Sequence, residues 1–343
     1  MKQTISKKLR LASLLGGLVV FAALAIGGYF SWAEPLPTKY SGPIEKVTIG
    51  IAIAPIGLHF FIAENEGYFA DNGLDVEIKR YPSGKAAVGD LIDNKVDMAA
   101  SAEFGFMGKV SDNSDLRIVA SIATTNINYL VANKNKGIEK ISDLKGKRIV
   151  TVSGTEAEFF LQTFLLLNDI STFDVEINYL NANEVAQSIL SGEADAAMIW
   201  EPHAYQIKIG LGEENTITWP GQSEKSSYWL LSTTGDFITR NPNIVERSLK
   251  ALVQAEKFIE TNEADAKAIL VSHDLDAQFV DDIWQKLNYS IALPQALLMA
   301  MEDGMRWKMK NKPPGEKEVP NYLDYIYPDA LKLVKFEAMT IIQ

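Results

Sequence analysis

Hydrophobic and polar positions along the body of the chain follow two periods, one typical of strands and one typical of helices. Residues 47–54 alternate with a period of two and end at Pro55, which predicts a strand followed by a turn. Residues 58–69 have helical spacing and close at Asn72-Gly73, which predicts one helix with a C-terminal cap. The pattern then predicts a strand, a helix and a strand over 75–81, 85–92 and 96–101.

The same order returns later in the chain as an internal repeat. Asp-Val-Glu-Ile occurs at 75–78 and again at 174–177, and Asp97 and Asp195 take equivalent places before the third strand of each copy. Because a helix separates successive strands, we expect parallel strands joined by right-handed crossovers. Ligands of open α/β sheets bind at the carboxyl ends of their strands, so we expect the site there.

The order of the elements predicts two open α/β sheets, one in each of two lobes. Strands at 116–124 and 128–133 carry the chain to the second lobe, and a strand at 228–234 brings it back. The predicted first lobe is 44–126 plus 228–343, and the second is 127–227. Helices predicted for the C-terminal region lie at 243–261, 264–271, 277–287 and 294–310, with a proline-rich break at 312–315.

Residues 1–33 have the features of a membrane-directed segment. Four positive charges within 1–10 precede an uncharged apolar segment at 11–30, and Ser31-Trp32-Ala33 fits a signal-peptide cleavage site. The apolar segment approaches the roughly 20 residues that span a bilayer, so cleavage after Ala33 and retention as an anchor both stay open. In either case the positive end stays in the cytoplasm and the remainder is exported, with 34–43 as a linker.

Composition excludes several classes of site. The chain has 343 residues, a net charge of −11 and no cysteine, which rules out disulfides, thiolate metal sites and a cysteine nucleophile. Its three histidines, His59, His203 and His273, lack the spacing of a metal site, and we expect the last two at the surface. An acidic chain without a nucleotide-binding motif predicts neither nucleic-acid binding nor a cofactor.

Four segments carry a family resemblance: Gly-Tyr-Phe to Gly-Leu-Asp-Val at 67–76, Asp-Leu-Lys-Gly-Lys within 141–148, Ser-Gly-Thr at 153–155, and Trp-Glu-Pro within 199–202. In this order the chain resembles periplasmic solute-binding proteins of the nitrate, sulfonate, taurine and thiamine-precursor type over about residues 45–340. The resemblance implies a two-lobed periplasmic-binding-protein fold of type II, closing at a hinge. It also implies a monomer in the periplasm that delivers a small solute to the membrane permease subunits of an ABC importer.

Candidate ligand-binding residues lie at predicted helix starts and strand ends. Free N–H groups at a helix start suit an anion, although the same residues could serve only as caps. Trp200 could stack on a flat ligand while Glu201 pairs with an amine, or Glu201 could form a hinge salt bridge. The candidates, with Lys85 beside them as a cation, are Gly57, His59, Ser83, Gly84, Ser101, Ala102, Glu103, Thr124, Thr125, Ser153, Gly154, Thr155, Trp200, Glu201 and Tyr228.

The leading hypothesis is a receptor for a small amine-bearing solute, such as an aminosulfonate or an aminopyrimidine, with no catalytic role. Glu103 and Glu201 favour the amine, and nitrate fits poorly beside two acids. One alternative is an enzyme similar to the thiamine pyrimidine synthase, which the resemblance includes, but that enzyme depends on a cysteine-rich motif that this chain lacks. A membrane-tethered sensor that signals through a protein partner is the other alternative.

Overall fold

The computed structural model describes residues 39–342 apart from 53–54, 111–113, 223–224 and 312–317. The chain divides into two units, Met1–Tyr40 and Ser41–Gln343, and every element below belongs to the second. The expected signal peptide or anchor and the expected proline-rich break lie outside the described residues. Within the described part, no helix has both the length and the apolar content needed to cross a membrane.

The first sheet has six strands in the order β11-β4-β10-β3-β1-β2. The first three strands of the chain run parallel, with β1 between β2 and β3, whereas β10 runs antiparallel to both β3 and β4. The parallel pairing predicted from the intervening helices is therefore confirmed. The strands are β1 (Glu45–Ala52), β2 (Leu74–Tyr81), β3 (Met98–Ala102), β4 (Leu116–Thr125), β10 (Ser227–Thr234) and β11 (Leu287–Asn288).

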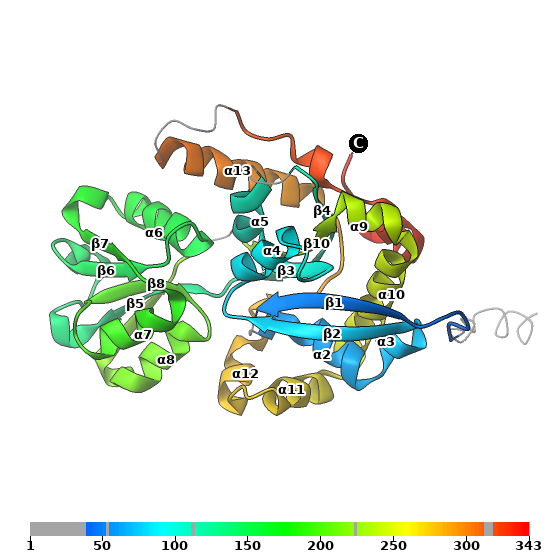
Figure 1. Ribbon diagram of the computed structural model, residues 1–343. Coiled ribbons are helices and arrows are strands. Elements are labelled where there is room, and N and C mark those ends of the chain that lie inside the picture. Colours follow the sequence, from blue (N-terminus) through cyan, green and yellow to red (C-terminus); the bar gives the residue numbers. More distant parts are fainter. Residues whose placement is uncertain (1–38, 53–54, 111–113, 223–224, 312–317, 343) are drawn as a thin grey trace, which may run out of the picture. The chain divides into compact units, whose positions relative to one another are not determined.

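The second sheet has five strands in the order β7-β6-β8-β5-β9, and its strands β6, β7 and β8 run parallel while β5 runs antiparallel to β8 and β9. The two predicted open α/β sheets are thus confirmed, and β4 and β5 connect them as expected (Figure 1). The strands are β5 (Asn128–Asn133), β6 (Arg148–Thr151), β7 (Glu176–Tyr179), β8 (Ala196–Trp200) and β9 (Thr216–Pro220).

The repeat in the sequence corresponds to a repeat in the structure. Strands β2-β1-β3 and β7-β6-β8 have the same order. In the first copy, the carboxylate of Asp97 accepts a hydrogen bond from the Thr48 N–H at 2.8 Å; in the second, Asp195 accepts one from the Arg148 N–H at 2.9 Å. Among the ion pairs of the described residues, one belongs to the second copy, with Arg148 Nη2 at 2.7 Å from Asp195 Oδ1, and none involves Asp97. The two aspartates therefore tie equivalent strands together.

The five-stranded sheet is covered by helices on both faces, which explains why its strands are apolar at successive positions. Leu130 and Ile149 belong to the core on one face, while their chain neighbours Val131 and Val150 belong to a separate cluster on the other. Successive side chains of a strand point to opposite faces, so both faces must be apolar. Figure 1 shows α6 (Glu156–Leu167) on one side and α7 (Ala182–Leu190) with α8 (His203–Leu211) on the other.

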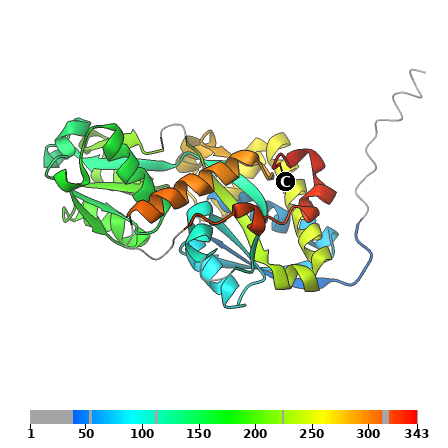
Figure 2. The ribbon, with the colours of Figure 1, turned by 90° about the horizontal axis from the view of Figure 1, so that it is seen from above.

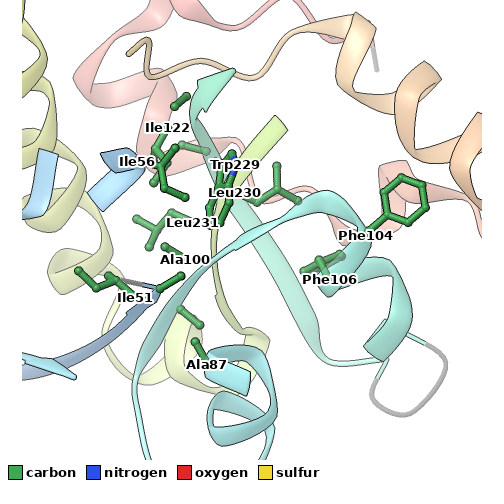
Figure 3. Close-up of a cluster of buried hydrophobic side chains, with 14 of the residues drawn as sticks. Ile51, Ile56, Ala87, Ala100, Phe104, Phe106, Ile122, Trp229, Leu230 and Leu231 are labelled. Atoms are coloured by element: carbon green, nitrogen blue, oxygen red, sulfur yellow. The ribbon is translucent and has the colours of Figure 1, made fainter. Parts of the chain in front are cut away.

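The helices of the six-stranded sheet pack on both of its faces. Figure 3 shows buried side chains of β1, α4, β3 and β10 gathered into one cluster, including Ile51, Ala87, Ala100 and Leu231. The last long helix, α13, packs against both α5 and α6 (Figure 2). The helices are α2 (Leu58–Asn65), α3 (Tyr68–Asp71), α4 (Gly84–Ile92), α5 (Glu103–Val110), α9 (Gly235–Arg240), α10 (Pro242–Thr261), α11 (Glu263–Ser272), α12 (Ala277–Trp284), α13 (Gln295–Asn311) and α14 (Asp329–Val334).

One predicted helix is wrong in its extent. The expected single helix over 58–69 is two helices, α2 and α3, separated at Gly67. Gly67 has φ +73°, a left-handed conformation that glycine adopts without steric cost and that interrupts the helical hydrogen bonds. The apolar spacing continues across the break because both helices pack on the same core, so periodicity alone does not reveal the break.

Candidate functional site

A cavity of about 70 Å³ lies where residues of the two sheets meet, at the edge that the strand order predicts. Ala52, Ala102 and Trp200 end the parallel strands β1, β3 and β8 at this cavity. Trp229 reaches it from the amino end of β10, where its Cα pairs with that of Ala102 in antiparallel register. A larger adjoining cavity of about 690 Å³ shares with it Pro82, Ser83, Lys85, Thr155 and Trp200.

The start of α4 supplies a hydroxyl and a cation. Ser83 is the N-cap, and its Oγ accepts from the Ala86 N–H at 3.3 Å. Gly84 packs so closely on Ser101 that an added Cβ would lie 2.5 Å from the Ser101 Cα, which leaves room only for glycine. The exposed Lys85 has neither an ion pair nor a hydrogen bond among the described residues. Its ammonium is therefore available to a bound anion.

The start of α6 faces the same cavity. Lys85 Nζ lies 3.5 Å from the position that a Cβ on Gly154 would take, so the two helix starts are close together. The Gly154 N–H already donates to Glu158 Oε2 at 2.7 Å, and Thr155 Oγ1 donates to the Val152 carbonyl at 2.7 Å. Thr155 makes no capping hydrogen bond with its side chain, so N–H groups in the first turn of α6 lack that cap.

Aromatic and apolar side chains form the rest of the wall. Phe104, Ile127 and Trp229 are each at least nine-tenths buried, and Figure 3 shows Phe104 and Trp229 on neighbouring elements. Trp229 Nε1 is buried and, among the residues described, has no acceptor. A buried indole N–H usually has a partner, so this one is a free donor for a solute. His203, which was expected at the surface, also lines the cavity, and burial lowers its pKa.

Glu201 lines the cavity but already caps a helix. Its Oε2 accepts from the Tyr205 N–H at 2.7 Å in the first turn of α8. Burial raises the pKa of Glu201 to about 7, and no cation of the described chain forms an ion pair with it. The hinge salt bridge considered from the sequence is therefore absent from the described ion pairs.

Glu156, which the sequence reasoning missed, is a buried acid in the cavity wall at the first position of α6. Burial raises its pKa to about 7, from an ordinary value of 4.5. The helix dipole acts in the opposite direction, but its roughly 0.3–1 kcal/mol corresponds to less than one pKa unit. Desolvation therefore dominates the pKa of Glu156, and part of this carboxyl group is protonated at neutral pH.

Of the residues predicted to bind ligand, Ser83, Gly84, Ala102, Gly154, Thr155, Trp200 and Glu201 line the small cavity, and Ser153 lines only the larger one. Thr124 and Thr125 pair with β10 and β11, and Ser101 is buried beneath Gly84. Glu103 and Tyr228 line a separate crevice of about 300 Å³. Gly57 is buried in a 3₁₀ turn before α2. Ligand contact by any of these residues stays a prediction.

His59 belongs to the hydrophobic core. It is fully buried, its ring meets Tyr289 edge-on at 5.5 Å, and burial lowers its pKa to about 3. It is not among the residues that line the cavity at the strand ends. The histidine that does line this cavity, His203, directly follows the predicted Trp200-Glu201-Pro202 segment, so proximity in the sequence was the only signal for it.

Comparison with solved structures identifies the fold. The alkanesulfonate-binding protein SsuA from Xanthomonas axonopodis pv. citri, bound to MOPS, superposes with a TM-score of 0.72. The match covers 84% of this chain and 100% of that protein at 16% sequence identity. The chain therefore has the predicted periplasmic-binding-protein fold.

Comparison with related sequences identifies the family. Residues 57–266 match the family described as NMT1/THI5 like, and the chain belongs to that family. A Haemophilus influenzae protein provisionally named for thiamine biosynthesis is 28% identical over 251 residues, which cover 71% of this chain and 79% of the relative. A Bacillus subtilis protein provisionally named for binding aliphatic sulfonates is 27% identical over 257 residues, covering 70% and 73%. The resemblance noted from the sequence is confirmed at the level of the family.

Proposed function

We propose that this protein is the extracytoplasmic solute-binding component of an ABC importer and that it captures a small organic anion in the cavity at the strand ends. The observation that carries this proposal is that three kinds of donor without a partner among the described residues line one small cavity. They are the Lys85 ammonium, N–H groups in the first turn of α6 and the Trp229 N–H. Helix starts and ammonium groups are typical anion ligands. Trp200, Phe104 and Ile127 supply an apolar wall for the organic part.

A sulfonate with an attached amine fits the cavity best. The sulfonate accepts hydrogen bonds from these donors, and the amine donates to Glu201. Oε2 of Glu201 already accepts from the Tyr205 N–H, so its other carboxylate oxygen is the one that faces the amine. The names of the Bacillus and Xanthomonas proteins favour a sulfonate. In this proposal, the lobes 44–126 plus 228–343 and 127–227 close over the solute, and residues 1–33 direct the protein to the periplasm as a signal peptide or an anchor. The permease subunits are its partners.

Thermal unfolding of residues 34–343 against a panel of solutes tests the proposal. The panel contains methanesulfonate, ethanesulfonate, taurine, nitrate, an aminopyrimidine and amino acids. A solute at about 1,000 times its dissociation constant adds about 4 kcal/mol to the free energy of unfolding, which raises the midpoint by several degrees. We expect the sulfonates to raise it. A shift with amino acids alone, or with no member of the panel, would contradict the proposed anion class.

The amine contact is tested with Glu201→Gln. Glutamine keeps an oxygen for the Tyr205 N–H but cannot carry a charge, so the fold should be retained. We expect taurine to bind about 10- to 100-fold more weakly, because a charge-assisted hydrogen bond contributes about 1.5–3 kcal/mol. Ethanesulfonate, which lacks the amine, serves as the matched probe and should lose no affinity. Equal taurine affinity in the variant and the wild type, measured by calorimetry, would remove the amine from the proposal.

The stacking role of Trp200 is tested by truncation. Trp200→Ala should weaken ethanesulfonate binding by about 30-fold, since truncating a buried aromatic anchor typically costs about 2 kcal/mol or more. Trp200→Phe is the matched control, because it keeps an aromatic face and should recover most of the affinity. Unchanged binding by the alanine variant would show that the indole does not contact the solute.

A further inference from the structure

Two buried carboxyl groups, Glu103 and Glu156, lie close enough for the charge of one to act on the other. Glu103 begins α5, beside the six-stranded sheet, and Glu156 begins α6, beside the five-stranded sheet. The two residues are only 3% and 4% exposed. None of the ion pairs among the described residues includes either one. Ionising both groups in such a place would bury two like charges without compensation, which is strongly unfavourable.

Hydrogen bonds satisfy the pair only in part. Glu103 Oε2 accepts from the Tyr228 N–H at 2.8 Å. Glu156 Oε1 accepts from Asn128 Nδ2 at a long 3.4 Å, and Glu156 Oε2 is buried without a partner in the described chain. Protonation of the carboxyl removes the cost of an unpaired buried charge. Burial raises the pKa of both acids, and the charge of Glu156 raises that of Glu103 further.

From this arrangement we infer that Glu103 and Glu156 together hold a proton that selects solutes by charge, so an anionic solute is captured along with that proton. The inference deepens the proposed function and rests on it. Glu156 lines the solute cavity, and an anion there makes ionisation of the pair still less favourable. Linkage is reciprocal, so protonation of the pair must strengthen binding of the anion by the same factor. A cationic solute would show the opposite dependence and release the proton.

Several other titratable groups lie near Glu103 and Glu156. Lys85, Glu201 and His203 line the same cavity, and Tyr228 faces Glu103. Lys225 and Asp303 line the crevice on the side of Glu103 and pair with each other at 3.0 Å. Glu201 titrates in the same range as Glu156, with a pKa of about 7. The contribution of Glu103 and Glu156 is therefore the part of the pH dependence of solute binding that disappears when either residue is replaced.

Calorimetric titration with methanesulfonate, between about pH 6 and about pH 8.5, tests the inference. Methanesulfonate keeps one negative charge throughout this range, and dimethyl sulfone is an uncharged probe of the same shape. We expect the dissociation constant of methanesulfonate to rise about tenfold or more over this range, because one linked proton gives up to a tenfold change per pH unit. Two buffers of different ionisation enthalpy should report proton uptake with methanesulfonate and none with dimethyl sulfone.

Two glutamine variants distinguish the contribution of Glu103 and Glu156 to the pH dependence of binding from that of Glu201. Glu156→Gln is isosteric and should lose most of the pH dependence. Glu103 lies outside the solute cavity. Glu103→Gln should move the pH dependence of binding to lower pH, because it removes an acid next to Glu156. Wild-type pH dependence in both variants, or wild-type affinity that does not change with pH, would overturn the inference and leave the proposed function standing. No methanesulfonate binding at any pH would overturn the inference, and the proposed function would be contradicted as well if no other anion of the panel bound.

Discussion

Lys85→Met is expected to weaken binding of ethanesulfonate by about 10- to 100-fold, the range that loss of one charge-assisted hydrogen bond gives. Lys85 lines both the small and the large cavity, and its Nζ approaches the Gly154 turn across them. It makes no ion pair in the described chain that binding would have to break, so its charge acts in full on the solute. Methionine is nearly as long as lysine but has neither its charge nor its N–H donors, and calorimetry reports the resulting loss of affinity directly.

Lys46→Met is the matched control for this change. Lys46 lies at the opposite end of β1, its side chain is 90% exposed, and its nearest acid, Asp75, is 4.0 Å away. The net charge of the protein changes equally in both variants, so long-range attraction of the anion changes by a similar amount. We expect Lys46→Met to bind ethanesulfonate almost as tightly as the wild type. Equal affinities for the two variants would place the sulfonate away from Lys85.

Gly84→Ala is expected to lower the free energy of unfolding by about 1–3 kcal/mol or more, the usual cost of overpacking a close contact. The new Cβ would lie 2.5 Å from the Ser101 Cα and 2.7 Å from its Cβ. Both belong to the central strand β3, which cannot move without disturbing its pairing with β1 and β10. Relief therefore requires α4 to move, which also displaces Ser83 and Lys85 at the cavity. Chemical denaturation measures the loss of stability, and calorimetric titration with ethanesulfonate measures the effect of the displaced Ser83 and Lys85 on binding.

Gly89→Ala in the same helix is the matched control. An added Cβ at Gly89 would meet no atom within 4 Å, and the residue lies inside α4 with helical neighbours on both sides. Alanine there should raise the free energy of unfolding by about 0.5–1 kcal/mol, because glycine has the poorer helix propensity. Opposite signs for two identical substitutions five residues apart are the expected result. Similar destabilisation by both would contradict the close packing of α4 on β3.

Local chemistry made most of the architecture predictable. Period-two alternation located β1 within a few residues, and the repeated Asp-Val-Glu-Ile located β2 and β7. The helices between them required parallel strands, and that requirement placed the candidate site at the carboxyl ends of β1, β3 and β8. Segments such as Ser83-Gly84 and Gly154-Thr155 were recognisable because a helix start needs particular residues at particular positions.

The sequence by itself therefore determined the elements, the two sheets and one edge of the cavity, since each depends on residues close together in the chain. Only the tertiary structure decided what completes that edge. Trp229 and Ile127 reach it from the starts of strands, because β10 and β5 run antiparallel to their neighbours. The electrostatic interaction between the buried Glu103 and Glu156 likewise joins two helix starts distant in sequence. Strand direction and burial arise from packing of the whole chain, so no local pattern reveals which acids lose their water or which donor is left without a partner.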